Sequence, residues 1–304
     1  MNSLLGHVTL NLLIFCVLFK VAWSYRSSGH SHHTGQNFPF GSGNRDNQNC
    51  PVPRPFAPNA EQVVDNVAYE CLPSYLRNPN AVLDEDDGTI EWAGGRQPDY
   101  TVVDEMFNRE RTIIHPRGSM EDRIQNLMKN WDKEVRYKRN PKQWIAVVPD
   151  NFYMIVNGGP RLTLAEISQL GSYNVFLGNS EFYSKDYINS TASDAAFSTA
   201  LKSGFALEVL EVYSPPPRVA LRFRHWGHMT GPMRCPMRNG TWLDAPPHGG
   251  VVEFYGDTVL HVNEKYQILS MENTFRGDTL MEQMVLGNGR VNNKVDAGSG
   301  SWIW

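Results

Sequence analysis

The sequence contains little cysteine and no excess of positive charge. Only four of its 304 residues are cysteine, and its formal net charge is -4. Nucleic-acid-binding proteins usually carry a basic patch or stripe, so we predict no nucleic-acid partner. After the first 24 residues no second apolar run is long enough to cross a bilayer, so we also predict no membrane association. With 41% hydrophobic residues, the chain can still bury a globular core.

Clusters of metal-binding residues are scarce as well. The segment "HSHH" near the N-terminus could bind a metal ion, but a solvated turn in a Ser- and Gly-rich tail explains it better. The segment "RHWGHMTGP" (Arg224–Pro232) holds two histidines three residues apart. Side chains on a strand alternate between its faces, so His225 and His228 would point in opposite directions. No cysteine or carboxylate nearby supplies a third ligand, and we predict neither a metal site nor a cofactor.

Residues 1–24 have the features of a secretory signal peptide. The apolar run "HVTLNLLIFCVLFKVAWS" is interrupted late by Lys20 and ends in the small-x-small pattern Ala22-Trp23-Ser24. A membrane anchor is the alternative, but Lys20 leaves too short an uninterrupted run to span a bilayer. We therefore predict cleavage before Tyr25 and a secreted, extracellular protein.

Three cysteines remain once the signal peptide is removed. In an oxidising compartment the economical pairing is Cys50 with Cys71, although the sequence does not decide between pairings. Cys235 would then be free, buried, or bonded to another chain in a homo-oligomer or an extracellular matrix. Sequons at Asn189 and Asn239 predict N-glycosylation.

Composition divides the mature chain into three parts. Residues 25–97 are predicted to be a flexible leader rich in Pro, Gly and Asn, with a short helix within Asn59–Leu72. Residues 98–286 are predicted to form the main domain. Residues 287–304 are predicted to form a flexible polar tail that ends in "SWIW".

Within the main domain, helical patterns come first and strand patterns follow. Ser119 is a suitable N-cap for the helix "MEDRIQNLMKNWDKEVRYK". Two shorter helices are predicted, one opening at Thr163 and ending at Gly171, the other between Ser193 and Gly204. The predicted strands are residues 205–213, 218–229, 251–262 and 266–275. This order predicts an α+β fold in which helices pack on one antiparallel sheet.

Charged side chains interrupt the apolar faces of these strands. His225 lies on an otherwise apolar face, where it is either a hydrogen-bonded core histidine or a proton-transfer residue that lines a cavity. Glu208 also lies among apolar residues, and an unpaired carboxylate in a dry interior costs several kcal/mol. Glu208 must therefore be paired, protonated or hydrated. Arg222 and Arg224, on the neighbouring predicted strand, are suitable ion-pair partners.

Four segments carry a resemblance to a known family: "GSMEDRIQNLMKNWDKEV", "GSYNVFL", "SGFALEVLEVYSPPPRVALRFRHWGHMTGP" and "PPHGGVVEFYGDTVLHVNEKYQ". They are similar to the plant pathogen-related proteins, of the SnoaL-like branch of the nuclear-transport-factor-two-like superfamily. The resemblance runs from about Pro98 to Met284. It implies a cone-shaped, strongly curved antiparallel sheet packed against about three helices, with a pocket inside. The N-terminal extension of this chain lies outside that domain.

The resemblance also implies that any activity lies in this pocket. Relatives that are enzymes use a pocket carboxylate or histidine as acid or base, and by position the candidate catalytic residues are Glu208 and His225. The candidate ligand-binding residues are Tyr173, Trp226, Glu253 and Tyr255. The signal peptide, the leader and the insertion Arg234–Ala245 depart from the cytoplasmic plant proteins, so no substrate carries over.

Three functions are compatible with these observations. The first is a secreted protein that binds a small apolar molecule in the pocket. The second is an extracellular structural or matrix protein that has kept the fold without catalysis. The third is a cofactor-free enzyme of the cyclase or isomerase type, in which His225 or Glu208 moves a proton.

Overall fold

The computed structural model describes residues 50–51, 56 and 67–287. The chain divides into two compact units, Met1–Asp46 and Asn47–Trp304, and every element below belongs to the second. The predicted signal peptide, the leader up to residue 49 and the tail from residue 288 lie outside the described residues. Most of the helix predicted within Asn59–Leu72 lies outside them too. In the described part, no helix is both long and apolar enough to cross a membrane.

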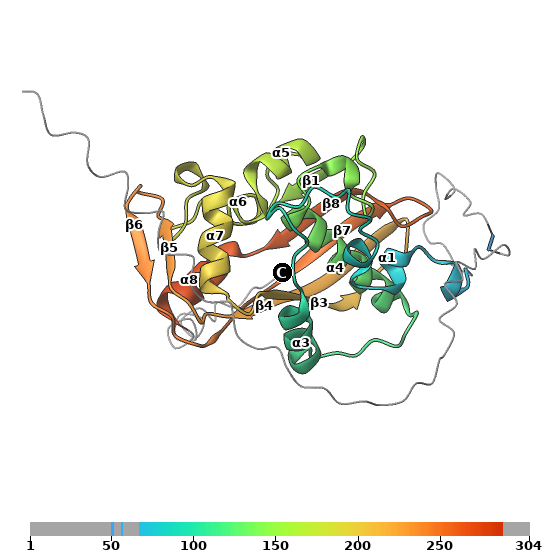
Figure 1. The fold of residues 1–304 in the computed structure, drawn as a ribbon, viewed down its shortest axis with the longest axis horizontal. Helices are drawn as coiled ribbons and strands as arrows, with labels where there is room; N and C mark the ends of the chain where they lie inside the picture. The colour runs from blue at the N-terminus through green and yellow to red at the C-terminus, as the bar shows by residue number, and fades with distance from the viewer. Residues whose placement is uncertain (1–49, 52–55, 57–66, 288–304) are drawn as a thin grey trace, which may run out of the picture. The chain divides into compact units, whose positions relative to one another are not determined.

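A six-stranded sheet is the main β-structure of the described residues, with the strand order β2-β1-β8-β7-β4-β3 (Figure 1). Its strands are β1 (Tyr153–Val156), β2 (Leu162–Thr163), β3 (Phe205–Val212), β4 (Arg218–His228), β7 (Val251–Val262) and β8 (Ile268–Phe275). A separate two-stranded sheet pairs β5 (Met233–Pro236) with β6 (Trp242–Ala245). Because β2 and β3 are the two edges of the large sheet, that sheet is open.

The four strands predicted from period-two alternation are confirmed as β3, β4, β7 and β8, and neighbours among them pair antiparallel. The prediction of a purely antiparallel sheet is wrong at one edge, where β1 pairs parallel with β8. No hairpin turn links β1 and β8, and more than 100 residues separate them. Their connection therefore does not force the two strands to run antiparallel. The sheet is not closed, and its topology leaves the strongly curved cone unconfirmed.

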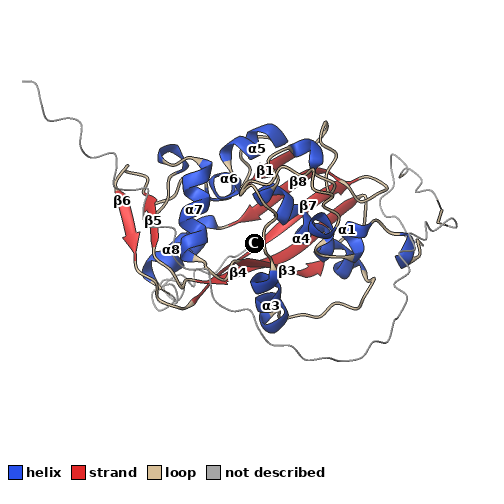
Figure 2. Ribbon diagram, viewed as in Figure 1, coloured by secondary structure: helices blue, strands red, loops and turns tan. Residues whose placement is uncertain are grey.

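More helices are described than the three that the pattern predicts (Figure 2). They are α1 (Ser74–Arg77), α2 (Ala81–Asp84), α3 (Thr101–Glu110), α4 (Met120–Tyr137), α5 (Leu164–Leu170), α6 (Ser172–Leu177), α7 (Ser190–Ala200) and α8 (Gly277–Leu286). The side chains of α4 share a core with Leu207, Val209 and Phe223 on one face of the sheet. Those of α3 pack against Ala206 and Trp226 on the other face. Helices therefore cover both faces of β3 and β4.

The helix α4 begins where the sequence predicts. Its N-cap Ser119 accepts a hydrogen bond from the backbone N–H of Asp122. The Asp122 carboxylate accepts from the N–H of Gly118, one residue before the position that a full capping box would use. The predicted apolar face is confirmed: Ile124, Leu127, Met128, Trp131 and Val135 all lie in the main core.

The opposite, polar side of α4 is buried as well, because residues 74–84 cover it. The Asn130 amide donates to the carbonyl oxygens of Tyr75 (3.2 Å) and Asn78 (2.8 Å) and accepts from the N–H of Val82 (3.0 Å). The Lys133 ammonium donates to the carbonyl oxygen of Pro79 at 2.9 Å. Burial lowers the pKa of Lys133 to about 8. The packed unit therefore extends N-terminal to Pro98, the start predicted from composition.

The two shorter helices test the predicted boundaries. α5 follows the full capping box of Thr163 and ends at Gly171, as predicted. α7 is the correction: its N-cap is Asn189, whose side chain accepts from the N–H of Ala192, and not Ser193. Ser193 lies inside the helix, where its hydroxyl hydrogen-bonds to the hydroxyl of Tyr183 at 2.6 Å. An Asn four residues upstream offers an equally good cap, and the sequence pattern does not rank the two.

The predicted disulfide between Cys50 and Cys71 is present, with the two Cα atoms 5.4 Å apart. Cys235 is free and buried, and its thiol donates a hydrogen bond to the carbonyl oxygen of Phe182. Burial raises the pKa of this thiol to about 12. Of the alternatives predicted for Cys235, the described chain shows a thiol that is both free and buried.

Candidate functional site

The alternation along β4 places its side chains in two different environments. His225 pairs in register with Leu207 of β3 and Phe254 of β7, and shares their face. Arg224, Trp226 and His228 lie on the opposite face. The two histidines therefore point apart, as the sequence indicates. Among the described residues, no three His, Cys, Asp or Glu side chains lie close enough together to hold a metal ion.

The face that carries His225 borders a small internal cavity. Its lining side chains are Met128, Trp131, Asp132, Arg136, Ser172, Tyr173, Phe176, Leu177, Phe205, Leu207, Phe223, His225, Phe254, Thr258, Asn273, Phe275 and Leu280. They come from α4, α6, α8 and the sheet, and they are mostly apolar. The cavity has a volume of about 50 Å³.

A glycine on β7 positions two of the aromatic rings of this lining. A Cβ atom on Gly256 would lie 2.6 Å from Cζ of Phe223 and 2.7 Å from Cβ of Phe275. Such distances are too short for a real contact, so only glycine lets both rings pack here. The rings of Phe223 and Phe254 meet edge to face at 5.9 Å, and Phe254 and His225 stack at 5.7 Å. The result is an aromatic wall that includes the imidazole.

One end of the cavity is ionic. The Asp132 carboxylate lies 3.1 Å from Nε of Arg136, one helical turn further along α4, and 3.8 Å from Nε2 of His225. Burial raises the pKa of Asp132, but the charge of Arg136 and the contact with His225 outweigh burial and hold it below its ordinary value. Burial also lowers the pKa of His225 despite the neighbouring carboxylate, which favours the neutral ring. This end of the cavity therefore holds the ion pair of Asp132 and Arg136 beside the neutral imidazole of His225.

Tyr173 lies beside this ionic end. The Arg136 guanidinium carbon is 5.1 Å from the centre of the Tyr173 ring, which stacks on Phe197 of α7 at 3.9 Å. Burial raises the pKa of Tyr173 to about 12, so its hydroxyl stays protonated and can donate a hydrogen bond.

Three of the lining side chains hold a buried nitrogen atom with no hydrogen-bond partner among the described residues: Trp131 Nε1, Asn273 Nδ2 and His225 Nδ1. Trp131 and Asn273 are 3% and 5% exposed, and neither the indole Nε1 nor the amide Nδ2 finds an acceptor. The other end of the Asn273 amide is fixed, because its Oδ1 accepts from the hydroxyl of Thr258 at 2.7 Å. Buried donors in native proteins are almost always paired with protein, water or ligand atoms. Both of these donors belong to residues that line the cavity.

Glu208 lies on the other face of the sheet, under the segment that follows α3. Its Oε1 accepts hydrogen bonds from the backbone N–H groups of Thr112 and Ile113, at 2.5 and 2.8 Å. Arg224 Nη1 lies 3.7 Å from its Oε2, so the cross-strand ion pair that the sequence suggests is confirmed. The carboxylate is fully buried and paired, and it does not line the cavity.

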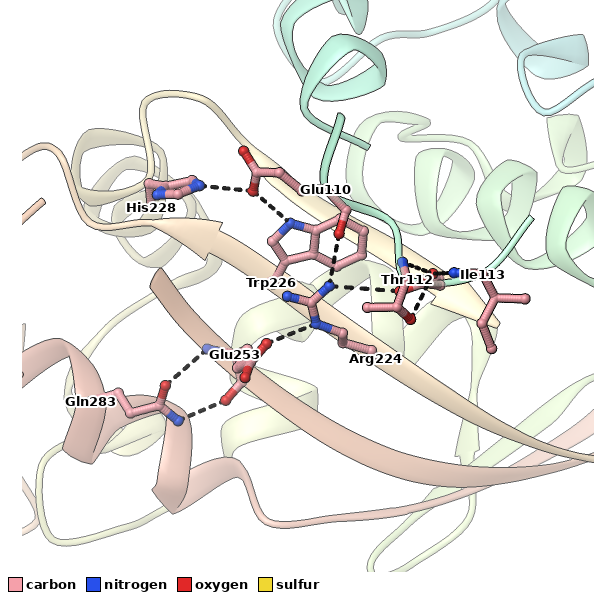
Figure 3. A network of polar contacts seen from close by, with 9 residues as sticks. Glu110, Thr112, Ile113, Arg224, Trp226, His228, Glu253 and Gln283 are labelled. Atoms are coloured by element: carbon pink, nitrogen blue, oxygen red, sulfur yellow. Dashed lines mark hydrogen bonds and ion pairs between the residues drawn. The ribbon is translucent and has the colours of Figure 1, made fainter. Parts of the chain in front are cut away.

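Trp226 and Glu253 belong to the same network as Glu208 (Figure 3). Arg224 Nε donates to Glu253 at 2.7 Å, and the backbone of Glu253 exchanges two hydrogen bonds with the side chain of Gln283 in α8. The Trp226 indole and His228 both contact one carboxylate oxygen of Glu110, at 3.1 and 2.8 Å. Burial raises the pKa of Glu110, but these hydrogen bonds and that of Arg109 bring it below its ordinary value. The network fastens α3 and α8 to the sheet.

Of the six predicted site residues, the structure therefore brings His225 and Tyr173 to the cavity. Glu208, Trp226, Glu253 and Tyr255 lie on the opposite face, and Tyr255 is 44% exposed there. Asp132 and Arg136 were not predicted. The sequence indicates them only weakly: Met128, Asp132 and Arg136 follow one another at intervals of four residues, so they share one side of the helix.

A scan against models of protein families finds no match. The solved structures with similar folds include a putative SnoaL-like polyketide cyclase from Jannaschia sp. CCS1 (13% identity, 56% of this chain and 97% of that chain, TM-score 0.30). They also include a protein with a ketosteroid isomerase-like fold from Catenulispora acidiphila (12% identity, 52% and 91% coverage, TM-score 0.29). At such identities and TM-scores we draw nothing further from them.

The comparison of sequences is more specific. A pathogen-related protein from Hordeum vulgare is 37% identical to this chain over 188 residues, which make up 60% of this chain and 76% of the Hordeum protein. The chain belongs to the family of the pathogen-related proteins.

Proposed function

We propose that this protein binds a small, mostly apolar molecule in the cavity between the sheet and helices α4 and α6. The observation that carries the proposal is the pair of unpartnered donors, Trp131 Nε1 and Asn273 Nδ2, in an otherwise apolar lining. Ligand sites are typically apolar with a few convergent polar groups. An acceptor oxygen on the ligand would satisfy a donor whose burial otherwise costs about 1–3 kcal/mol.

The free volume limits the size of this molecule. About 50 Å³ is far below the roughly 300–1,000 Å³ of sites for drug-sized ligands. The ligand is therefore compact, or it displaces lining side chains. The small volume equally favours the second candidate function, an extracellular structural protein that has kept the fold without a working pocket.

Proton transfer is the third candidate function, and the contact between His225 and Asp132 favours it. A neutral imidazole beside a carboxylate can accept a proton from a bound molecule and hold the resulting charge. Proton transfer requires a molecule bound in the same cavity, so the test of ligand binding described below comes first.

Secretion remains part of the proposal. The disulfide between Cys50 and Cys71 is typical of proteins from oxidising compartments. Both sequon asparagines, Asn189 and Asn239, are exposed and could carry glycans. The Edman sequence of the mature protein tests the predicted start at Tyr25.

The cavity is tested by native mass spectrometry of the protein produced in a secreting eukaryotic host. Wild type should carry a bound small molecule that His225→Leu loses. His228→Leu is a matched control, because it makes the same change on the same strand but on the opposite face, and it should keep the ligand. A wild-type protein free of ligand, or equal retention by both variants, would contradict the proposal and favour the structural function.

A further inference from the structure

A second pocket lies next to the cavity, where the end of α6 meets the start of α8. It is lined by Asn157, Phe176, Leu177, Asn179, Ser180, Glu181, Phe182, Phe275, Arg276, Gly277, Asp278 and Glu282. In contrast to the cavity, this pocket is open and largely polar, and its volume is about 480 Å³. Figure 1 shows α6 and α8 near the end of β8.

The two spaces share a wall. Phe176, Leu177 and Phe275 line both, so one layer of side chains separates the cavity from the open pocket. The rings of Phe176 and Phe275 are 5.9 Å apart. The wall is close-packed: a Cβ atom on Gly277 would lie only 3.3 Å from Cδ2 of Leu177. Leu177 and Phe176 are only partly buried, so they are the side chains of this wall with most room to change rotamer.

We infer that the cavity and the open pocket are two halves of one binding site, gated by Phe176, Leu177 and Phe275. Its ligand is amphipathic: a mostly apolar part that carries a hydrogen-bond acceptor for Trp131 and Asn273 lies in the cavity, and a hydrogen-bond-donating, non-anionic head lies in the open pocket. This inference rests on the proposed function, because the unpartnered donors of Trp131 and Asn273 are what mark the inner half as a ligand site. A site made of both spaces is also not limited to a compact ligand, because the combined volume of the cavity and the open pocket falls in the ordinary range for ligand sites.

The charges of the open pocket define the head group. Three carboxylates, Glu181, Asp278 and Glu282, face one guanidinium, Arg276, which is paired with Asp278 at 3.1 Å. The N-terminus of α8 adds the equivalent of about +0.5 charge, which does not offset the excess of two negative charges. The pocket therefore offers acceptors to an ammonium or hydroxyl group and repels a carboxylate.

Lining amides do not change this result, because the protein already uses them. Asn157 Oδ1 accepts from the N–H of Phe275 at 2.9 Å, and Asn179 Nδ2 donates to Asp186 at 2.7 Å. The carboxylates of Glu181 and Glu282, together with the Ser180 hydroxyl, which has no hydrogen-bond partner among the described residues, are thus groups that a ligand head would meet.

Three probes of equal chain length test the head group: hexylammonium, hexan-1-ol and hexanoate. Binding is followed by the indole N–H signal of Trp131 in ¹H–¹⁵N spectra, assigned with Trp131→Phe. At low ionic strength hexylammonium should bind about tenfold more tightly than hexanoate, with hexanol between them. The double variant Glu181→Gln/Glu282→Gln should bring this ratio close to one.

The outcomes separate the two proposals. If none of the probes shifts the Trp131 signal, the cavity is not a ligand site and the proposed function fails. If all three bind with equal affinity, or if hexanoate binds best, the cavity stands but the acidic half-site is wrong.

The gate is tested by Leu177→Ala, with Leu162→Ala as the matched control. Leu162 is a partly buried leucine of β2 that lines neither space. Opening the wall should raise both the association and the dissociation rate of hexanol about tenfold or more, as measured from the exchange line shapes of the Trp131 signal. Rates equal to those of the control would overturn the gate; if Leu177→Ala does not fold, Leu177→Val gives the same comparison with a smaller expected increase.

Discussion

At residue 225 the side chain of β4 lines the cavity, and at residue 224 it lies in a buried ion pair on the other face. Period-two alternation predicts this division and offers Arg222 and Arg224 as partners for Glu208, of which the structure selects Arg224. It does not predict which face borders a cavity, because that depends on which helix covers it. The backbone donors to Glu208 Oε1 come from Thr112 and Ile113, 96 and 95 positions away, and leave no local signal.

A substitution at Glu208 tests its structural role. Glu208→Ala should lower the free energy of unfolding by about 3 kcal/mol, because it removes two backbone hydrogen bonds and leaves Arg224 with one carboxylate fewer. Glu208→Gln keeps an acceptor and should cost less. Urea denaturation measures both. If Glu208 instead acted in the pocket, both variants would be nearly as stable as wild type but would lose the bound ligand.

Among the elements, those with a strong period or a full capping box were predicted well. The N-caps of α4 and α5 are Ser119 and Thr163, as predicted, and β3, β4, β7 and β8 follow their alternation. The short strands β1, β5 and β6 were missed, since four residues are too few to show a period of two. The start of α7 was misplaced because Asn189 and Ser193 are both good caps, and the choice between them depends on the tertiary contact of Ser193 with Tyr183.

The cap of α7 can be separated from its sequon. In a host that does not glycosylate, Asn189→Ala should lower stability by about 1 kcal/mol, because the N–H of Ala192 loses its acceptor. Thr191→Val destroys the same sequon but keeps the cap, so it should change stability by less than about 0.5 kcal/mol. Thermal unfolding of the two variants gives the comparison, and equal losses would show that Asn189 is not the cap.

On the scale of the whole molecule, the sequence indicates the α+β class and the family, but not where the packed unit begins. The polar, Pro-rich composition before Pro98 predicts a flexible leader. In the structure Leu72, Tyr75, Leu76 and Ala81 belong to the main core. Short helices such as α1 and α2 carry almost no periodic signal, and tertiary packing alone holds them in place.

The disulfide should contribute to the stability of this unit. Cys50 and Cys71 are 21 residues apart, and a closed loop of this length stabilises the folded state by about 3 kcal/mol. Reduction should therefore lower the free energy of unfolding of wild type to that of the double variant Cys50→Ser/Cys71→Ser. The double variant itself should not respond to the reductant. A wild type that is equally stable before and after reduction would show that the bond adds nothing to the fold.

The burial of α4 on all sides has a practical consequence for anyone who shortens this protein. A truncated chain that starts at Pro98 retains the whole region of resemblance, yet it uncovers Asn130 and Lys133, whose partners Tyr75, Asn78 and Pro79 would be missing. Water would then reach the flank of the central helix, on the side opposite Trp131 and the cavity. The shortest chain that folds like the full-length protein must therefore include the residues that cover the polar side of α4. A boundary placed by homology at Pro98 would leave those residues out.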